Sequence, residues 1–298
     1  MLCSRPAEIC PSRQRTTFVR ELNNVVGIVT GASRGVGPHI AAELARAGVQ
    51  LALVARSEEG LRATAEKVGR LGPEPLVVPA DVSDEGAQRR IVETVRRELG
   101  PAGILVNNAG IEHITRFQDA SVESIRQVLL VNLFGAEAMT RLVLPDMLEA
   151  GRGHVVNIGS VGGRTAYPYA TINSSAKHGL VGFTWSLREE LRGTGVGVSA
   201  VYPTLISDVG ISAGWQAGRR PPLLGRVGPD EVARAVLKCI REDKVEITVA
   251  PVMEKVADVV SALSPRLTAW IARNGGIYKY LRGVADAQTR SQQHSEPA

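Results

Sequence analysis

Residues 25–37 read VVGIVTGASRGVG, and this stretch decides the fold of the whole chain. Its first six residues form a β-branched apolar run, and Gly31, Gly35 and Gly37 follow directly before an amphipathic segment that extends to about Gly48. Glycines at a strand-to-helix turn let the backbone approach a pyrophosphate, and the free N–H groups of a helix N-terminus favour an anion. The stretch therefore predicts a buried strand, a dinucleotide-binding turn and a helix in succession.

The same rhythm continues along most of the chain. Short apolar runs occur at 51–55, 76–80, 103–107, 154–159, 197–202 and 246–250, and helical segments separate them at 57–72, about 84–99, within 121–150, about 168–193 and 229–241. Buried strands that alternate with helices are typical of a parallel sheet covered on both faces. We predict a single Rossmann-like α/β domain over residues 23–251, with a doubly wound parallel sheet of about seven strands.

The two ends depart from this pattern. Residues 1–22 are rich in Arg, Pro and Ser and lack the apolar core of a secretory signal, so they are expected to form a disordered tail. Residues 252–298 repeat apolar positions at helical spacing, with breaks at Pro265 and at Asn274-Gly275-Gly276, and predict a C-terminal helical extension and tail. These helices either pack on the domain or a second subunit, or rest as a basic amphipathic surface on a membrane interface.

Composition limits the classes of function. With 44% hydrophobic and 22% charged residues, the 298 residues fit one large soluble domain. Three cysteines without a CxxC pair or ligand cluster indicate free thiols in a reducing compartment, hence a cytoplasmic protein with no metal site. The net charge is +5, but the basic residues are scattered without aromatic interleaving, so no nucleic-acid partner is expected. No apolar run reaches the roughly 20 residues of a spanning helix.

Several further motifs follow the predicted strands in a fixed order. Asp81-Val82 follows the third strand, and Asn107-Asn108-Ala109-Gly110 follows the fourth. Asn132 lies in the segment VLLVNLFG. Ser160 lies thirteen residues before Asn173, and Lys177 lies four residues after Asn173. Over roughly residues 25–250 the chain resembles the short-chain dehydrogenase/reductase family, in which the last spacing is Ser…Tyr-x-x-x-Lys.

The resemblance implies an oxidoreductase that moves a hydride between a nicotinamide cofactor and a hydroxyl/carbonyl pair. The expected catalytic residues are Ser160, which holds the substrate oxygen, Lys177, which binds the nicotinamide ribose, Asn132, which anchors a water, and Asn173 at the tyrosine position. The expected cofactor-binding residues are Gly31, Ser33, Arg34, Gly35, Val36, Gly37, Arg56, Asp81, Val82, Asn108, Ala109, Gly110, Lys177, Pro203 and Ile206.

Charge at the end of the second strand indicates which cofactor is bound. A carboxylate there would accept a hydrogen bond from the ribose 2′-OH and repel a 2′-phosphate. This chain has Ala55 followed by Arg56, and Arg34 stands in the glycine loop. Two guanidinium groups can hold a phosphate through charge-assisted hydrogen bonds, so NADP(H) is favoured over NAD(H).

Asn173 removes the expected proton donor, because a carboxamide does not exchange a proton usefully near neutral pH. Four interpretations stay open at this point. In the first, the enzyme works slowly or through a relay of Ser160 and a water held by Lys177. In the second, Tyr169 substitutes as the proton donor, provided that the helix has begun four residues before Asn173. In the third, the protein is a non-catalytic, NADP(H)-binding regulatory or partner-binding module, and in the fourth, Asn173 is a sequence variant of an active enzyme.

The loop at about 205–226 normally covers the substrate in proteins of this family. Here it is largely apolar, which indicates a lipophilic alcohol or carbonyl compound as substrate. Asp208 stands where many family members have a threonine. The long helices within 121–150 and 168–193 are expected to form a homodimer or homotetramer.

Overall fold

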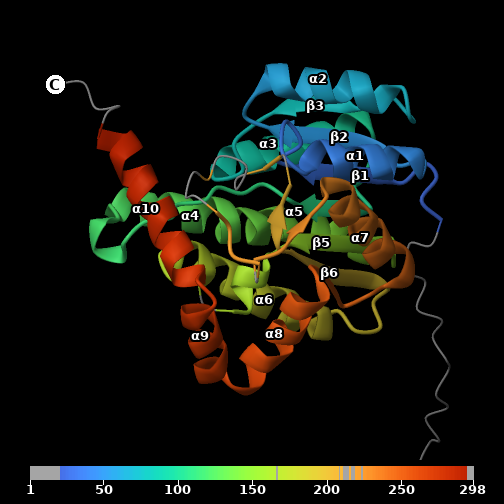
Figure 1. Ribbon diagram of the computed structural model, residues 1–298. Helices are drawn as coiled ribbons and strands as arrows, with labels where there is room; N and C mark the ends of the chain where they lie inside the picture. Colours follow the sequence, from blue (N-terminus) through green and yellow to red (C-terminus); the bar gives the residue numbers. More distant parts are fainter. Residues whose placement is uncertain are drawn as a thin grey trace, which may run out of the picture.

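The computed structural model describes residues 21–165, 167–207, 209–210, 215, 219–222 and 224–293. Residues 1–20 of the tail expected at 1–22, and Asp208, lie outside the described residues; Leu22 is described and is buried in a core cluster, at 3% exposure. Within the described chain, one seven-stranded sheet forms the centre of the domain (Figure 1).

The main sheet is parallel throughout, in the order β3-β2-β1-β4-β5-β6-β9. Four of its strands are buried along their whole length, as expected when helices cover both faces. The doubly wound fold predicted from the sequence is confirmed. The strands are β1 (Val26–Thr30), β2 (Gln50–Ala55), β3 (Leu76–Pro79), β4 (Ile104–Asn107), β5 (Gly153–Ile158), β6 (Val196–Pro203) and β9 (Glu246–Val249), and a separate small sheet pairs β7 (Leu205–Ile206) with β8 (Arg226–Val227).

Two groups of helices cover the sheet and form two buried apolar clusters. One cluster joins the sheet to α1 (Gly37–Arg46), α2 (Glu58–Gly69) and α7 (Pro229–Glu242). The other joins it to α3 (Glu85–Glu98), α5 (Gly135–Glu149) and α6 (Thr171–Glu190). Each helix packs on the sheet through its apolar stripe. The loops of the site follow the carboxyl ends of the strands, which the helices leave uncovered.

The long helix expected within 121–150 is divided in three. It consists of α4 (Val122–Leu129), a π-helical turn η2 (Leu130–Phe134) and α5, with Pro145 inside α5. The run Val122–Glu149 is long and apolar enough to cross a membrane by length and composition alone, which the sequence prediction did not foresee. Core helices of soluble proteins meet the same criterion, and Met139, Val143 and Met147 of this run lie in a core cluster.

The C-terminal extension forms three helices, α8 (Val252–Leu263), α9 (Pro265–Asn274) and α10 (Ile277–Gln293) (Figure 1). Tyr280, Leu281 and Val284 of α10 are buried in a third apolar cluster with Ile114 and Leu224 of the domain. The structure thus packs α10 on the domain. Five large apolar side chains of α8 stay more than half exposed, among them Val252 at 74%.

Candidate active site

The carboxyl ends of the strands open into a cavity of about 1210 Å³. It extends from the glycine turn after β1 to the loops after β4, β5 and β6, and lies where the sheet order changes direction between β1 and β4. Ligands of doubly wound sheets bind in this crevice. All of the expected site residues line it except Gly37 and Tyr169.

The glycine turn is shaped by close backbone contacts. Gly31 and Gly35 both have φ +67°, in the left-handed region that favours glycine. A Cβ on Gly37 would lie 2.2 Å from the carbonyl oxygen of Gly31, and one on Gly31 would lie 2.8 Å from the Cα of Ala109. Gly37 therefore lies behind the cavity and holds the turn that exposes Gly31, Ser33 and Gly35 to it.

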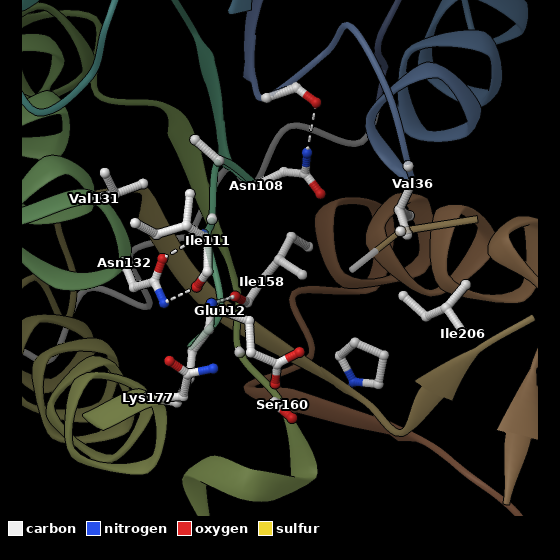
Figure 2. A pocket seen from close by; sticks show the side chains of 18 of the residues that line it. Val36, Asn108, Ile111, Glu112, Val131, Asn132, Ile158, Ser160, Lys177 and Ile206 are labelled. Atoms are coloured by element: carbon white, nitrogen blue, oxygen red, sulfur yellow. Dashed lines mark hydrogen bonds between the residues drawn. The ribbon is translucent and has the colours of Figure 1, made fainter. Parts of the chain in front are cut away.

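The segment after β4 is tied to this turn. The Asn108 side chain donates to the carbonyl oxygens of Thr30 at 2.9 Å and Gly31 at 3.1 Å. The Thr30 hydroxyl accepts the backbone N–H groups of Asn108 and Ala109 at 3.0 and 3.1 Å. These bonds fix the floor of the cavity between β1 and β4 (Figure 2).

Two exposed arginines stand at the end of the cavity formed by the β1 and β2 loops. Arg34 comes from the glycine turn and Arg56 from the end of β2. Arg56 Nη1 lies 3.9 Å from Asp81 Oδ2, while Asp81 Oδ1 accepts the Ser83 hydroxyl at 2.7 Å. Among the described contacts neither guanidinium group has an ion pair shorter than the 3.9 Å contact of Arg56 with Asp81.

Ser160 and Lys177 lie at the opposite end of the cavity. Ser160 lies two residues after β5, directly before the short helical turn Val161–Gly163. Its hydroxyl accepts a hydrogen bond from the backbone N–H of Gly162 at 3.1 Å. Lys177, on α6, donates from Nζ to the carbonyl oxygen of Ile158 at 2.7 Å. Burial lowers the pKa of Lys177 to about 8, with the Glu112 carboxylate opposing the shift.

Asn132 holds the loop after β4 from the π-helical turn η2. Its Oδ1 accepts the Ile111 N–H at 2.8 Å, and its Nδ2 donates to the Ile111 carbonyl oxygen at 2.8 Å (Figure 2). A π-helical turn displaces residues from the regular α-helical positions and is frequent at functional sites. This reciprocal pair fixes the start of the loop that carries Glu112.

Asn173 is buried in the first turn of α6, at 8% exposure, and lines the cavity. Its Oδ1 accepts the backbone N–H of His113 at 3.2 Å. Because this bond uses the carboxamide oxygen, the amide NH₂ faces Glu112, with which it forms a side-chain hydrogen bond. Asn173 therefore joins α6 to the loop after β4.

Glu112 is the site residue that the sequence analysis missed. Figure 2 shows its side chain between Lys177 and Ser160, with the carboxyl group directed toward Ser160. Burial raises the pKa of Glu112 to about 7, although the hydrogen bond from Asn173 and the charge of Lys177 both act to lower it. The available signal was an acidic residue two positions after Asn107–Gly110, at the carboxyl end of a buried strand.

The expectation for Tyr169 depended on α6 having begun at that residue, and this condition is wrong. The helix begins at Thr171, and Tyr169 has φ +67° in the preceding turn. Its hydroxyl accepts a hydrogen bond from Arg282 Nε of α10 at 3.2 Å, and the residue does not line the cavity. The turn geometry sends the phenol to the C-terminal helix instead of the site.

Tyr167 does line the cavity, close to Gly162. Burial, followed by the charges of Glu254 and Asp258, raises the pKa of Tyr167 above its ordinary value. A phenol with a raised pKa is a weak match for proton transfer near neutral pH.

An apolar wall closes the side of the cavity next to Ser160. It is formed by Tyr167 of the loop between β5 and α6, by the segment after β6 and by one residue of α10, Leu281, whose place in the site the sequence did not indicate. Trp215 packs against Tyr280 of α10, with ring centroids 6.4 Å apart. The wall consists of Tyr167, Leu205, Ile206, Val209, Trp215, Leu224 and Leu281.

Comparisons with known proteins agree with this geometry. The sequence model of a family described as short chain dehydrogenase matches residues 25–219. The chain is 34% identical over 261 residues to ketoacyl reductase HetN of Nostoc sp., covering 87% of this chain and 89% of that protein. It is 30% identical over 266 residues to dehydrogenase/reductase SDR family member 7B of Rattus norvegicus, covering 85% and 82%.

Two solved structures are also similar. A variant of actinorhodin polyketide ketoreductase with NADPH has a TM-score of 0.69 and 33% identity, covering 76% of this chain and 95% of that chain. A metagenomic short-chain oxidoreductase in complex with NADP has a TM-score of 0.67 and 29% identity, covering 77% and 98%.

Proposed function

Because the chain belongs to the short-chain dehydrogenase family, we propose that it is an NADP(H)-dependent oxidoreductase acting on a carbonyl/hydroxyl pair of a lipophilic small molecule. One observation carries the proposal. A single cavity joins the glycine turn, Arg34 and Arg56 to Ser160 and Lys177, with an apolar wall beside them.

The residues present fit a dinucleotide. Gly31 and Gly35 adopt the left-handed φ of the turn and line the cavity at the N-terminus of α1, where the backbone can bind a pyrophosphate. Arg34 and Arg56 provide two cations and no carboxylate replaces Ala55 at the end of β2, which supports NADP(H) over NAD(H). The NADP and NADPH of the two similar structures support the same choice.

The chain's own residues bind and orient the reactants. A bound nicotinamide supplies or accepts the hydride at the substrate carbon. The Ser160 hydroxyl donates a hydrogen bond to the substrate oxygen, and Lys177 presents its ammonium group to the nicotinamide ribose. Below its pKa of about 8 Lys177 is charged, so it also stabilises negative charge that develops on the substrate oxygen.

The apolar wall supports a lipophilic substrate. Trp215, Leu224 and Leu281 can bury hydrocarbon, since apolar surface removed from water gives about 25 cal/mol per Å². The similar ketoacyl and polyketide reductases support carbonyl reduction as the direction of the reaction.

Titration with NADPH, followed by its fluorescence, tests the cofactor, and a panel of lipophilic ketones tests turnover. Saturable binding at micromolar NADPH with ketone-dependent oxidation is expected. Absence of binding contradicts the proposal. Binding without turnover, in both the wild type and Asn173→Tyr, supports the non-catalytic NADP(H)-binding module instead.

We further propose a cytoplasmic homodimer or homotetramer that forms through α4–α5 and α6. Exposed apolar side chains on these helices, Val122 at 72% and Trp185 at 50%, support such an interface. Sedimentation velocity measures the mass of the assembly. Val122→Glu is expected to lower it, whereas a monomeric wild type contradicts the interface.

The α8–α9 hairpin is proposed to rest on an anionic lipid surface. Its two acidic residues, Glu254 and Asp258, are buried at 8% and 5% exposure, so its outer face is apolar and cationic. The exposed members of this face are Val252, Met253, Lys255, Val256, Val259, Leu263, Arg266, Leu267, Trp270 and Arg273.

Co-sedimentation with vesicles tests this contact. Phosphatidylserine vesicles are expected to retain the protein, phosphatidylcholine vesicles to retain less, and Leu263→Glu to release it. Equal partitioning of the wild type and Leu263→Glu contradicts the membrane contact. A concentration-dependent increase in mass that Leu263→Glu removes would assign the face to a second copy of the chain.

A further inference from the structure

The proposed function leaves the proton donor unassigned, because the Ser160 hydroxyl and the Asn173 carboxamide do not exchange a proton usefully near neutral pH. The Lys177 ammonium group donates to the Ile158 carbonyl oxygen at 2.7 Å and is assigned to the nicotinamide ribose. Carbonyl reduction adds an electron pair to the substrate oxygen, which must then receive a proton. Among the described residues that line the cavity, the acidic ones are Asp81, beside Arg56, and Glu112, which lies on the side of Ser160 and Lys177.

Glu112 lies on a loop whose backbone is hydrogen-bonded to other elements on both sides of this residue. Asn132 binds both polar groups of Ile111, Asn173 accepts the N–H of His113, and Gln288 Oε1 of α10 accepts the N–H of Ile114 at 3.1 Å. Next, the N–H of Thr115 donates to the Tyr169 carbonyl oxygen at 2.9 Å. These contacts come from η2, α6, its preceding turn and α10, so four separate elements hold the backbone around Glu112.

The side chain of Glu112 is held as well. The Asn173 amide donates to its carboxyl group, and Lys177 acts on it from the next turn of the same helix. Its carboxyl group points toward Ser160, the residue expected to hold the substrate oxygen (Figure 2). A tyrosine at 173 would place its own hydroxyl in this region, whereas asparagine is shorter and leaves the space to Glu112.

We infer that Glu112 is the proton donor and acceptor of this active site, and that Asn173 is the residue that positions it. This inference rests on the proposed function. As the substrate oxygen gains the electron pair released by hydride addition, the O–H bond of the Glu112 carboxyl breaks and the new O–H bond of the alcohol forms. The resulting carboxylate takes up a proton from water, and in the oxidative direction it accepts the proton of the alcohol.

Charge around Glu112 is suited to this cycle. Lys177 faces it from α6, and His113 follows it on the loop; burial lowers the pKa of His113, so this imidazole is neutral near pH 7. Burial holds the pKa of Glu112 at about 7, where both protonation states are populated at neutral pH. Reduction needs the protonated form and is expected to slow above pH 7, while oxidation needs the carboxylate and is expected to slow below it.

The first test measures protonation without turnover. Infrared difference spectra between pH 5 and pH 9, with NADP⁺ bound, are compared for the wild type, Glu112→Gln and Glu137→Gln. Glu137 on α5 is a matched control, since burial also raises its pKa but it does not line the cavity. A protonated carboxyl band that titrates near pH 7 and disappears only in Glu112→Gln is expected; titration of Glu112 below pH 5 overturns the inference.

The second test measures the rate of NADPH oxidation across pH with a lipophilic ketone. Removal of a positioned acid costs about 10²–10⁴-fold. Glu112→Gln is expected to lose at least about 100-fold in kcat, to lose the transition near pH 7 and to keep NADPH affinity within about twofold. Glu112→Asp should keep the transition at a lower rate, and Glu137→Gln should match the wild type.

Introducing a tyrosine separates the roles further. Asn173→Tyr in the Glu112→Gln background supplies a new acid and is expected to restore turnover. The inference fails if Glu112→Gln turns over like the wild type, or if the wild type binds NADPH but only Asn173→Tyr turns over. Loss of NADPH binding by the wild type refutes the proposed function itself, so the two failures are distinguishable.

Discussion

The carboxamide oxygen of Asn173 accepts the backbone N–H of His113 at 3.2 Å, while its amide group bonds to Glu112. One side chain thereby fixes both the backbone and the carboxyl group of the loop after β4. Asparagine can do this because its short carboxamide carries the acceptor and the donor on two separate atoms, whereas the phenol of the expected family residue has a single oxygen at the end of a longer side chain.

Removing this side chain should loosen the loop. Asn173→Ala is expected to increase amide hydrogen exchange at Glu112 and His113 and to cost about 1–3 kcal/mol of unfolding free energy, because buried polar groups lose their partners. Gln288→Ala is the control, since it should affect the Ile114 amide first. Unchanged exchange at His113 in Asn173→Ala would contradict this role.

Glu112 should make stability depend on pH. Its folded pKa of about 7 lies above its ordinary value of 4.5, so the folded protein binds the proton more tightly than the unfolded chain. This tighter proton binding contributes up to about 3 kcal/mol to the free energy of unfolding. The contribution is fully present below pH 4.5 and is lost as the pH rises through 7. Urea unfolding of Glu112→Gln should show a gain relative to the wild type that grows over this interval; a constant difference rejects the shift.

Arg34 and Arg56 should determine cofactor preference. Replacing either by alanine removes charge-assisted hydrogen bonds worth about 1.5–3 kcal/mol, so the Kd for NADPH should rise about 10–100-fold. The Kd for NADH should change less than about twofold. Arg62→Ala, which removes an exposed pair with Glu58 on α2, is the control. Equal weakening of both cofactors would show that neither arginine meets the 2′-phosphate.

Two glycines on helices should respond oppositely to alanine. Gly37→Ala places a Cβ 2.2 Å from the Gly31 carbonyl oxygen, so the turn must open and NADPH binding should be lost. Gly182→Ala on α6 meets nothing within 4 Å and should stabilise the chain by about 0.5–1 kcal/mol. Thermal unfolding and NADPH titration measure both variants. A destabilised Gly182→Ala would indicate that a second subunit covers this position.

The ion pairs of Arg164 should hold α8 to the domain. Arg164 Nη1 lies 2.6 Å from Glu246 Oε1 and Nε lies 3.1 Å from Asp258 Oδ1, with Asp258 5% exposed. Arg164→Leu leaves a buried carboxylate unpaired and should cost about 3–5 kcal/mol by urea unfolding. Asp258→Asn added to Arg164→Leu should recover part of that loss, and a further decrease would contradict the pairing.

The sequence predicted the sheet well, and the residues that it placed in the site line one cavity, apart from Gly37 and Tyr169. The seven strands of the main sheet were found within about two residues, because buried parallel strands are short apolar runs and their helices have a 3.6-residue apolar period. The short pair β7–β8 was not predicted. The glycine turn was found for a similar reason, since its residues are neighbours in the chain. Less regular segments were predicted less well: the π-helical turn at 130–134 and the positive φ of Tyr169 have no local pattern.

The chain by itself therefore determined the α/β fold, the dinucleotide turn and the absence of a tyrosine at 173. Only the tertiary structure decided what stands beside Asn173, because His113 lies 60 residues away in sequence and Gln288 lies 174 residues from Ile114. Periodicity and spacing report contacts within one element, whereas the environment of Glu112 is made by loops and helices that meet only after folding. Burial then raises its pKa to about 7, a property that no local pattern contains.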